Sequence, residues 1–495
     1  MRLHVRGVPL IEERLYVDGQ LRVAEGGRTY ENRSPVTEMV IGLAADASHR
    51  DMEDAIAAAR VAFDSTSWSS DRALRARCLR QLHASLERNA AAIKETTRVE
   101  VGATEPALET VQFNTAIKHL LYAADTVETY RWEEDLGDTK FLGVPSRRKL
   151  LREAAGVAGC ITPWNAPMQV NLAKLTAALG AGCTAVLKPA PDTPWTATVL
   201  GRLIAEDTDI PAGVLNIVTT TDNSVAQLLA EDPRVDLISF TGSTAVGRHL
   251  MAAAAPTIKR VFLELGGKSA CIVCEDADLD AVATMTAYGS CAQAGQGCSI
   301  NTRLLVHRSV YEEMVGKVAS AFEAITYGDP ADPRNYMGPL INQKQYDRVL
   351  NYIEIGKREG ARLVTGGRRP PGMAKGYFVE PTVFADVDPA SRLAQEEIFG
   401  PVLCVIPFDD DDQAVEIANG TIYGLAAQVE SASRERADAL VKRLRAGVIN
   451  VNGGAYHAPD TPFGGYKQSG IGREMGVLGF DEYTEVKVVA YGIPD

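Results

Sequence analysis

The chain has 495 residues, of which 46% are hydrophobic and 23% are charged, and its formal net charge is −13. This length is too great for a single core, so two or three domains are expected, and the composition excludes a mostly disordered chain. The acidic surplus argues against a nucleic-acid partner, because phosphate binding needs a basic surface.

The first 130 residues are predicted to be largely helical, over 52–63, 75–99 and 106–130. The N-terminus does not resemble a signal peptide, and no run of apolar residues is long enough to predict a membrane span. The eight cysteines are scattered, as expected of small buried hydrophobes in a reducing compartment. These features predict a cytoplasmic protein with no membrane partner.

Two segments, about 140–152 and 485–491, read as strands with no obvious partner in their own chain. An exposed apolar edge strand is a hazard that proteins pair or cover. Either a second subunit covers these segments, or each is an ordinary edge strand folded onto its own domain.

Residues 154–264 alternate between short apolar runs and helical patterns, which predicts βαβ units around a parallel sheet. The expected strands are 157–162, 185–188, 214–218, 235–240 and 260–264, and the expected helices are 169–179, 193–205, 224–230 and 245–254. A second series begins at 270, with strands at 270–274, 302–307, 402–408, 426–430 and 447–451. The fold class is therefore α/β, with two open sheets.

Cys298 is the strongest nucleophile candidate, in the segment AQAGQGCSINTRLLV. The glycines at 295 and 297 allow close backbone approach to a ligand and place the thiol in a constrained loop before a strand. A thiolate there can attack a carbonyl carbon, while backbone N–H groups stabilise the oxyanion. Taken alone, a glycine-flanked cysteine is more often structural.

Two other strand ends carry polar candidates. Glu264 in LELGGKS is placed to act as a general base, although an ion pair with a lysine or arginine explains it equally well. Asn165 in ITPWNAP can donate its amide to an oxyanion, although a turn anchored by Trp164 is the simpler explanation.

The segment FTGSTAVG, from Phe240 to Gly247, reads as a strand, a tight turn and a helix N-terminus, which favours a pyrophosphate. Lys188 also ends a strand, where ligands of open α/β sheets bind. The glycine fingerprint of dinucleotide-binding folds is absent, so this is a weak signal. The histidines are dispersed and the Cys271/Cys274 pair reads as strand packing, so no metal site is expected.

Seven motifs stand in an order that resembles the aldehyde dehydrogenase superfamily from about residue 15 to the C-terminus. They are PWNAP at Pro163, LKPA at Leu187, FTGST at Phe240, ELGGKS at Glu264, GQGC at Gly295, EEIFGPV at Glu396 and PFGGYKQSGIGRE at Pro462. The 34-residue separation of Glu264 from Cys298 also matches that family.

This resemblance implies that Cys298 attacks an aldehyde while Asn165 and the Cys298 backbone N–H hold the oxyanion. Hydride transfer to a nicotinamide then leaves a thioester, which water activated by Glu264 hydrolyses. Lys174 matches a lysine often found near the catalytic machinery.

The resemblance also implies a set of cofactor contacts. Lys188 would bind the adenosine ribose, Ser243 the pyrophosphate, and Glu397 with Phe399 the nicotinamide ribose. Further contacts are expected at Thr162, Trp164, Gly242, Leu265 and Gln345. The implied architecture has an atypical Rossmann-like cofactor domain (1–135 and 153–264), a catalytic domain (265–480) and a small β oligomerisation element (136–152 and 481–495), assembled as a homodimer or homotetramer.

The sequence departs from the family pattern at several positions. Pro191 replaces the glutamate that often binds the adenosine ribose, so NADP remains a possible cofactor. No neighbouring arginine is present to bind a 2′-phosphate, and NAD is therefore preferred. Ala166 and Ala173 replace bulky aromatics, and Gly297 precedes the nucleophile. We therefore expect a roomy apolar channel, lined partly by Val170, Tyr456 and His457, that takes bulky, aromatic, cyclic or medium-chain aldehydes.

Three other functions remain open at this stage. A coenzyme A-acylating dehydrogenase would pass the thioester on, although the presence of Glu264 favours hydrolysis. A cysteine hydrolase without redox chemistry would leave Lys188, Glu397 and Phe399 without a purpose. An inert binding protein on this fold would not need Cys298, Glu264 and Asn165 together.

Overall fold

Five parallel strands in the order β11–β10–β7–β8–β9 form the centre of the first sheet. The structure is a computed structural model that describes residues 7–494. The strands are β7 (Val157–Ile161), β8 (Thr184–Lys188), β9 (Leu215–Ile217), β10 (Leu237–Thr241) and β11 (Arg260–Glu264), and the helices between them are α6 (Pro167–Ala181), α7 (Pro194–Asp207), α8 (Asn223–Glu231) and α9 (Thr244–Ala254). The predicted βαβ series is confirmed.

The strand order reverses between β7 and β10, because the chain adds strands first on one side of β7 and then on the other. Ligands of open α/β sheets bind outside the carboxyl ends of the strands at such a switch point. Since β7 and β8 are buried along their whole length, the sheet is covered on both faces and only its ends can be a site.

Antiparallel strands from distant parts of the chain close the two edges of this sheet. They are β1 (Leu15–Val17) and β2 (Gln20–Arg22) at one edge and β19 (Gly470–Ile471) at the other. The hairpin of β3 (Thr29–Arg33) and β4 (Val40–Ala45) lies nearby. The prediction that the first 130 residues are largely helical missed these four N-terminal strands.

The N-terminal helices are shorter than predicted. The helix α1 (His49–Ser65) agrees, but the single helix expected over 75–99 is two, α2 (Arg72–Arg88) and α3 (Ala90–Val101). Asn89 separates them, because its side chain donates to the carbonyl of Ser85 and its backbone leaves the helical region. The helix expected over 106–130 is likewise wrong, being reduced to α4 (Glu105–Leu108) and α5 (Lys118–Thr129) with an irregular turn between them.

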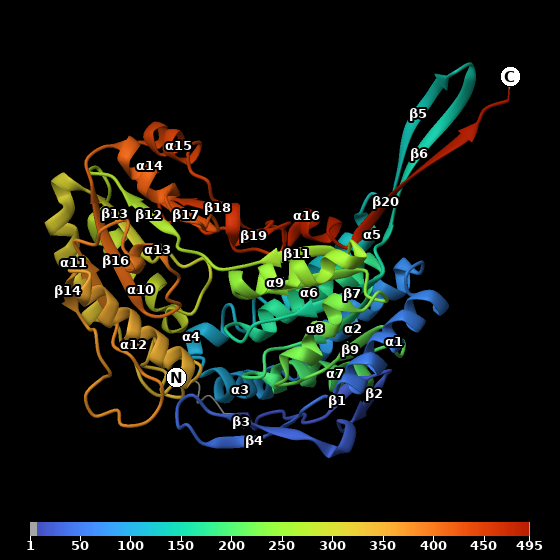
Figure 1. The fold of residues 1–495 in the computed structure, drawn as a ribbon, viewed down its shortest axis with the longest axis horizontal. Helices are drawn as coiled ribbons and strands as arrows, with labels where there is room; N and C mark the ends of the chain where they lie inside the picture. The colour runs from blue at the N-terminus through green and yellow to red at the C-terminus, as the bar shows by residue number, and fades with distance from the viewer. Residues whose placement is uncertain (1–6, 495) are drawn as a thin grey trace.

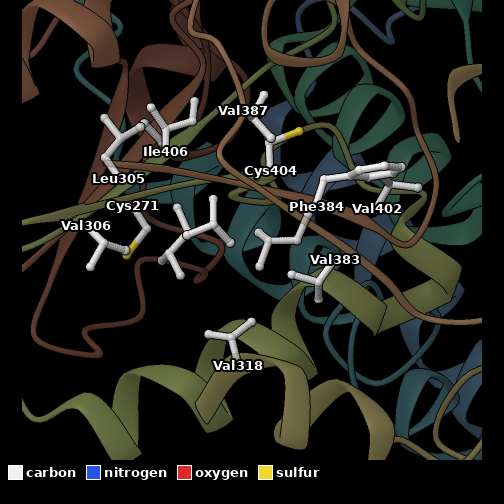
Figure 2. Packing of buried hydrophobic residues seen from close by; sticks show 14 of the residues in the cluster. Cys271, Leu305, Val306, Val318, Val383, Phe384, Val387, Val402, Cys404 and Ile406 are labelled. Carbon is white, nitrogen blue, oxygen red and sulfur yellow. The ribbon is translucent and has the colours of Figure 1, made fainter. Parts of the chain in front are cut away.

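The second sheet has the order β14–β15–β16–β13–β12–β17–β18. Its strands are β12 (Ala270–Val273), β13 (Arg303–His307), β14 (Arg362–Thr365), β15 (Thr382–Ala385), β16 (Val402–Phe408), β17 (Ala426–Glu430) and β18 (Val448–Val451). The helices of this half are α10 (Leu279–Cys291), α11 (Tyr311–Glu323), α12 (Gln343–Arg358), α13 (Arg392–Gln395), α14 (Asp411–Asn419) and α15 (Arg434–Val441), whereas α16 (Gly476–Asp481) packs on the first half through Phe480. All contacts except β14–β15 are parallel. Figure 2 shows side chains of its core, among them Leu305, Phe384, Cys404 and Ile406.

A three-stranded arm projects from the half that holds the first sheet, next to α5 (Figure 1). It consists of β5 (Glu133–Phe141), β6 (Val144–Ala154) and β20 (Thr484–Gly492), with β6 in the middle. The expectation that these segments lack a partner in their own chain was wrong, because β20 pairs with β6 along its whole length. Phe141, Val486 and Val488 remain exposed on the arm.

Among residues 7–494 no helix combines the length and apolarity needed to cross a membrane.

Candidate active site

The carboxyl ends of four neighbouring strands of the first sheet carry predicted site residues. Thr162 follows β7, Lys188 ends β8, Ser243 caps the helix after β10, and Glu264 ends β11. Register pairs Ile161 with Lys188 and Thr241 with Glu264. The sequence analysis therefore correctly placed all four at the carboxyl ends of neighbouring strands.

Glu264 is buried, at 2% exposure, and neither carboxylate oxygen has a hydrogen-bond partner within the described part of the chain. Burial raises its pKa well above the ordinary range, and the nearby Glu474 adds to this, while Lys174 and Arg473 oppose it. The carboxylate faces Gly464, where an added Cβ would lie 2.7 Å from Oε1. A buried carboxylate without partners is typical of a base held ready for a substrate or water.

Cys298 lies in a strained loop between α10 and β13. Gln293, Ala294 and Gly295 have successive positive φ values of 50°, 56° and 72°. A Cβ on Gly295 would lie 2.2 Å from the carbonyl carbon of Gly400, so only glycine fits there. Such strain persists when the surrounding structure enforces it, as at functional sites.

The same loop brings the thiol to the first sheet. The Cys298 carbonyl packs so tightly against Gly267 that a Cβ there would lie 2.4 Å from it. Cys298 is the one cysteine of the eight that is not fully buried, and all eight are free thiols. Burial raises its pKa to about 12, with further contributions from Glu264 and Glu397, so the resting thiol is protonated.

Asn165 reaches across to the nucleophile loop, where its Nδ2 donates to the carbonyl of Gln296 at 3.0 Å. Gln112 in turn donates its amide to the Asn165 carbonyl at 2.8 Å and contacts the side chain of Gln293. The sequence reasoning missed Gln112, because it lies in the irregular turn before α5 and carries no local motif.

Lys174 is buried in α6 and pairs with Glu474 at 3.0 Å. It also donates to the hydroxyl of Ser239 at 3.0 Å. Lys174 and Glu474 both affect the pKa of Glu264, so the structure places Lys174 beside the base. Glu474, which the sequence reasoning missed, lies within the PFGGYKQSGIGRE motif.

The predicted ribose-binding Lys188 is buried, and burial lowers its pKa to about 8, with Asp192 opposing that shift. It makes no ion pair within 4 Å among residues 7–494. Pro191 lies next to Asp192, whose carboxylate accepts from Asn342 at 2.8 Å. The hydroxyl of Thr162 donates to the side chain of Asn171, on α6, at 2.7 Å.

The loop of the EEIFGPV motif faces the first sheet through two side chains. Glu397 accepts from the backbone N–H of Gly267 at 3.0 Å, and burial raises its pKa. Phe399 has a φ of 62° and meets Trp164 edge to face, with ring centroids 5.4 Å apart.

Gln345 holds this loop from α12, because its amide donates to the carbonyls of Ile398 and Phe399. It is buried, so its amide is engaged in positioning the loop. At the first sheet, a Cβ on Gly242 would meet the ring of Phe240 at 2.4 Å, and Leu265 packs closely against Gly247 of α9.

On the substrate side, Ala166 and Ala173 are buried and Val170 is partly exposed. Tyr456 donates its hydroxyl to Ser299 at 2.9 Å, next to Cys298, and stacks on Phe463.

Among the described residues no group of three or more His, Cys, Asp or Glu side chains could hold a metal ion.

The family profile for the aldehyde dehydrogenase family matches residues 22–489. The chain belongs to this family. It is 41% identical to 3-succinoylsemialdehyde-pyridine dehydrogenase from a Pseudomonas species over 96% of this chain and 97% of that one. As an aldehyde dehydrogenase, it is an oxidoreductase that acts on an aldehyde group.

Solved aldehyde dehydrogenases share the fold. That of Mycobacterium tuberculosis, complexed with NAD+, has a TM-score of 0.93 and 38% identity, with 99% of both chains covered. A cysteine-to-alanine mutant of aldehyde dehydrogenase C from Pseudomonas syringae, complexed with NAD+ and octanal, has a TM-score of 0.92 and 38% identity, with 98% of both chains covered. The predicted family and fold class are thus confirmed.

Proposed function

We propose that this aldehyde dehydrogenase oxidises bulky aldehydes to carboxylic acids with NAD+, through a thioester on Cys298. One observation carries the proposal. A free, partly accessible thiol, an unpartnered buried carboxylate and a side-chain amide meet where the two sheets face each other.

Burial of the site, together with the carboxylates of Glu264 and Glu397, raises the pKa of the Cys298 thiol, so the resting thiol is neutral. Cys298 must therefore lose its proton before it attacks. The proton of the thiol passes to solvent, so Glu264 stays available as a base for the later attack by water. The sulfur then bonds to the aldehyde carbon, and the carbonyl oxygen becomes an oxyanion that accepts from Asn165 and from the Cys298 backbone N–H.

The residues at the edge of the first sheet fit a dinucleotide. Ser243 and the N-terminus of α9 suit the pyrophosphate, Lys188 suits the adenosine ribose, and Glu397 and Phe399 suit the nicotinamide ribose. When bound, NAD+ supplies the acceptor for the hydride that leaves the former aldehyde carbon. Asp192, which stands beside Lys188, would oppose a 2′-phosphate, so NAD is preferred although Pro191 replaces the usual glutamate.

Glu264 completes the cycle, because its raised pKa makes it a stronger base than an exposed glutamate and it takes a proton from the water that attacks the thioester. The acid is released, and the departing sulfur takes that proton from Glu264, which restores the thiol. Transfer of the acyl group to coenzyme A is the competing outcome, and the free carboxylate of Glu264 favours water. A cysteine hydrolase without redox chemistry remains the other alternative, and the family membership argues against it.

The arm of β5, β6 and β20 corresponds to the β element expected over 136–152 and 481–495, and it is proposed to be the oligomerisation element of a homodimer or homotetramer, since it exposes apolar side chains on a thin sheet. The cofactor domain would span 1–135 and 153–264, and the catalytic domain 265–480. The eight free thiols suit a reducing compartment such as the cytoplasm.

The test is a panel of aldehydes assayed with NAD+ and with NADP+, following the reduced nicotinamide and the acid formed. Each buried methylene contributes about 0.8 kcal/mol, so kcat/KM should rise at least about a hundredfold from acetaldehyde to octanal or to an aromatic aldehyde. Ala166→Phe should erase the advantage of the large aldehydes. Equal efficiency for acetaldehyde and octanal would contradict the proposed substrate class, and acid formation without reduced nicotinamide would contradict the reaction.

A further inference from the structure

A buried polar pair lies on the face of α6 that leads away from the oxyanion amide. Ala166, Gln169 and Ala173 are spaced three and four residues apart, so they share one face of this helix. Gln169 is the third residue of α6, and Asn165 lies in the turn just before the helix begins. The sequence had suggested that the channel face of α6 is apolar throughout, but Gln169 makes part of this face polar.

Gln169 contacts His119 of α5, with 2.6 Å between their Nε2 atoms. The two residues are 6% and 3% exposed. Gln169 Oε1 is buried and has no hydrogen-bond partner among residues 7–494. Buried polar atoms in native proteins are nearly always paired, so an orphan acceptor points to a group that the protein does not itself supply.

A chain of contacts connects this pair to the nucleophile. His457 lies close enough to His119 to lower its pKa electrostatically. The neighbouring ring of Tyr456 lies 6.0 Å from that of His457, and its hydroxyl donates to Ser299, the residue after Cys298. His457, Tyr456 and Ser299 thus link the pair to the loop that carries the nucleophile.

The two side chains of this pair, Gln169 and His119, are uncharged near neutral pH. Burial, helped by His457, lowers the pKa of His119 to about 4, so its ring carries no charge near neutral pH. His119 therefore offers no cation to a carboxylate, and burying an uncompensated charge is costly. What Gln169 Oε1 lacks is a hydrogen-bond donor.

We propose that Gln169, held in place by His119, recognises an uncharged hydroxyl or N–H group on the substrate, remote from its aldehyde carbon. This rests on the proposed function and narrows its substrate class. The preferred substrate is a ring-sized aldehyde with a neutral donor at its distal end. A site built around an unpaired acceptor discriminates against an analogue that lacks the donor, because the acceptor then stays buried and unsatisfied.

The first test uses the wild-type enzyme and four para-substituted benzaldehydes. The substituents are hydroxymethyl, ethyl, methoxymethyl and carboxylate, which supply a donor, its apolar match, an acceptor without a donor, and a charge. We expect kcat/KM for the hydroxymethyl compound to exceed that of the other three by about tenfold or more. An ethyl compound turned over as efficiently as the hydroxymethyl one would overturn the proposal, as would an equally efficient methoxymethyl compound.

The second test assigns the preference to Gln169. Gln169→Met keeps the length of the side chain and removes the acceptor, so the ratio of kcat/KM for hydroxymethyl over ethyl should fall to about one. The readout is a ratio of two substrates, so a general loss of activity or stability cancels. Gln343→Met, an exposed glutamine on α12, is the matched control and should keep the wild-type ratio. An unchanged ratio in Gln169→Met would overturn the role of Gln169.

These outcomes are separable from failure of the proposed function. Reduction of NAD+ with 4-ethylbenzaldehyde supports the dehydrogenase reaction whatever the ratio is. If Gln169→Met does not fold, the wild-type panel still decides whether a distal donor is recognised.

Discussion

The two sheets contribute to the active site in different ways. The first sheet presents Lys188 and Glu264 at the ends of buried parallel strands, where the backbone is regular. The second half of the chain presents Cys298 and Phe399 on loops, and its backbone there is strained, with positive φ at Gln293, Ala294 and Phe399. The proposed base and the proposed adenosine contact Lys188 thus rest on regular strands, whereas the proposed nucleophile and the nicotinamide-side residue Phe399 lie on loops.

This difference predicts which substitutions act locally and which act through loop geometry. Residues at strand ends can lose their side chain without moving the backbone, because the sheet fixes the strand. The loop residues depend on side-chain clamps such as Asn165 to Gln296 and Gln345 to Phe399. Four tests, which use five substitutions, probe the comparison from the largest expected effect to the smallest.

Cys298→Ala should reduce turnover by at least about 10⁴-fold, because no other group near the substrate can form the covalent bond. NAD+ binding, followed by fluorescence or calorimetry, should change little, since the cofactor contacts lie mainly on the first sheet. In the wild-type enzyme an alkylating reagent should label Cys298 first, because the other seven cysteines are buried. Near-normal turnover by the alanine variant would exclude Cys298 as the nucleophile.

Glu264→Gln should slow steady-state turnover by about 10²- to 10³-fold, because the amide cannot take a proton from water. A burst of up to one NADH per site should precede the slow phase, and mass spectrometry should detect an acyl group on Cys298. Asp276→Asn, in a carboxylate of the second half that hydrogen-bonds Ser431, serves as a control and should show no burst. Full-rate, linear NADH formation by Glu264→Gln would remove Glu264 from this role.

The charges around Glu264 should set the pH dependence of deacylation. Its pKa is raised by burial and by Glu474, and Lys174 lowers it. Glu264 works as a base only when ionised, so deacylation should fall as the pH drops through this raised pKa. Lys174→Met should raise the pKa of Glu264 and shift the acidic limb of the rate profile to higher pH by about one unit. Glu474→Gln removes a negative charge and should shift it to lower pH.

Opposite shifts from these two variants would show that both charges act on Glu264. Each variant also breaks a buried ion pair, at a cost to stability of about 3 kcal/mol or more, which thermal unfolding measures separately. Shifts in the same direction would contradict the electrostatic account.

Gln345→Leu should weaken NAD+ binding by about fivefold, because it frees the carbonyls of Ile398 and Phe399 and relaxes a residue with positive φ. Alkylation of Cys298 in the absence of cofactor should proceed at the wild-type rate. Gln343→Leu, two residues earlier on α12, is a matched control, since its amide donates to Asp347 at the surface. Equal NAD+ affinity in both variants would show that the clamp is not needed.

The sequence by itself determined the five parallel strands of the first sheet, five of the seven strands of the second (β14 and β15 were missed), and the polar residues at the strand ends of the first sheet. Local patterns suffice there, since a buried strand is a short apolar run and the residue after it lies at the sheet edge. The order of the motifs then identified the family, and with it Cys298, Glu264 and Asn165 as candidates. One helix was predicted where α2 and α3 lie, because the helical spacing of apolar residues continues through Asn89. The side chain of Asn89, however, donates to the carbonyl of Ser85 and ends α2.

Only the tertiary structure decided what depends on residues distant in sequence. It showed that β20 pairs with β6 across more than 300 residues, that Gln112 holds Asn165, and that Lys174 pairs with Glu474. It also placed His119 beside Gln169, which local spacing could not predict because they lie on different helices. Strand ends are fixed by short-range patterns, whereas partners across the site are fixed by packing between elements, for which a single sequence carries no local signal.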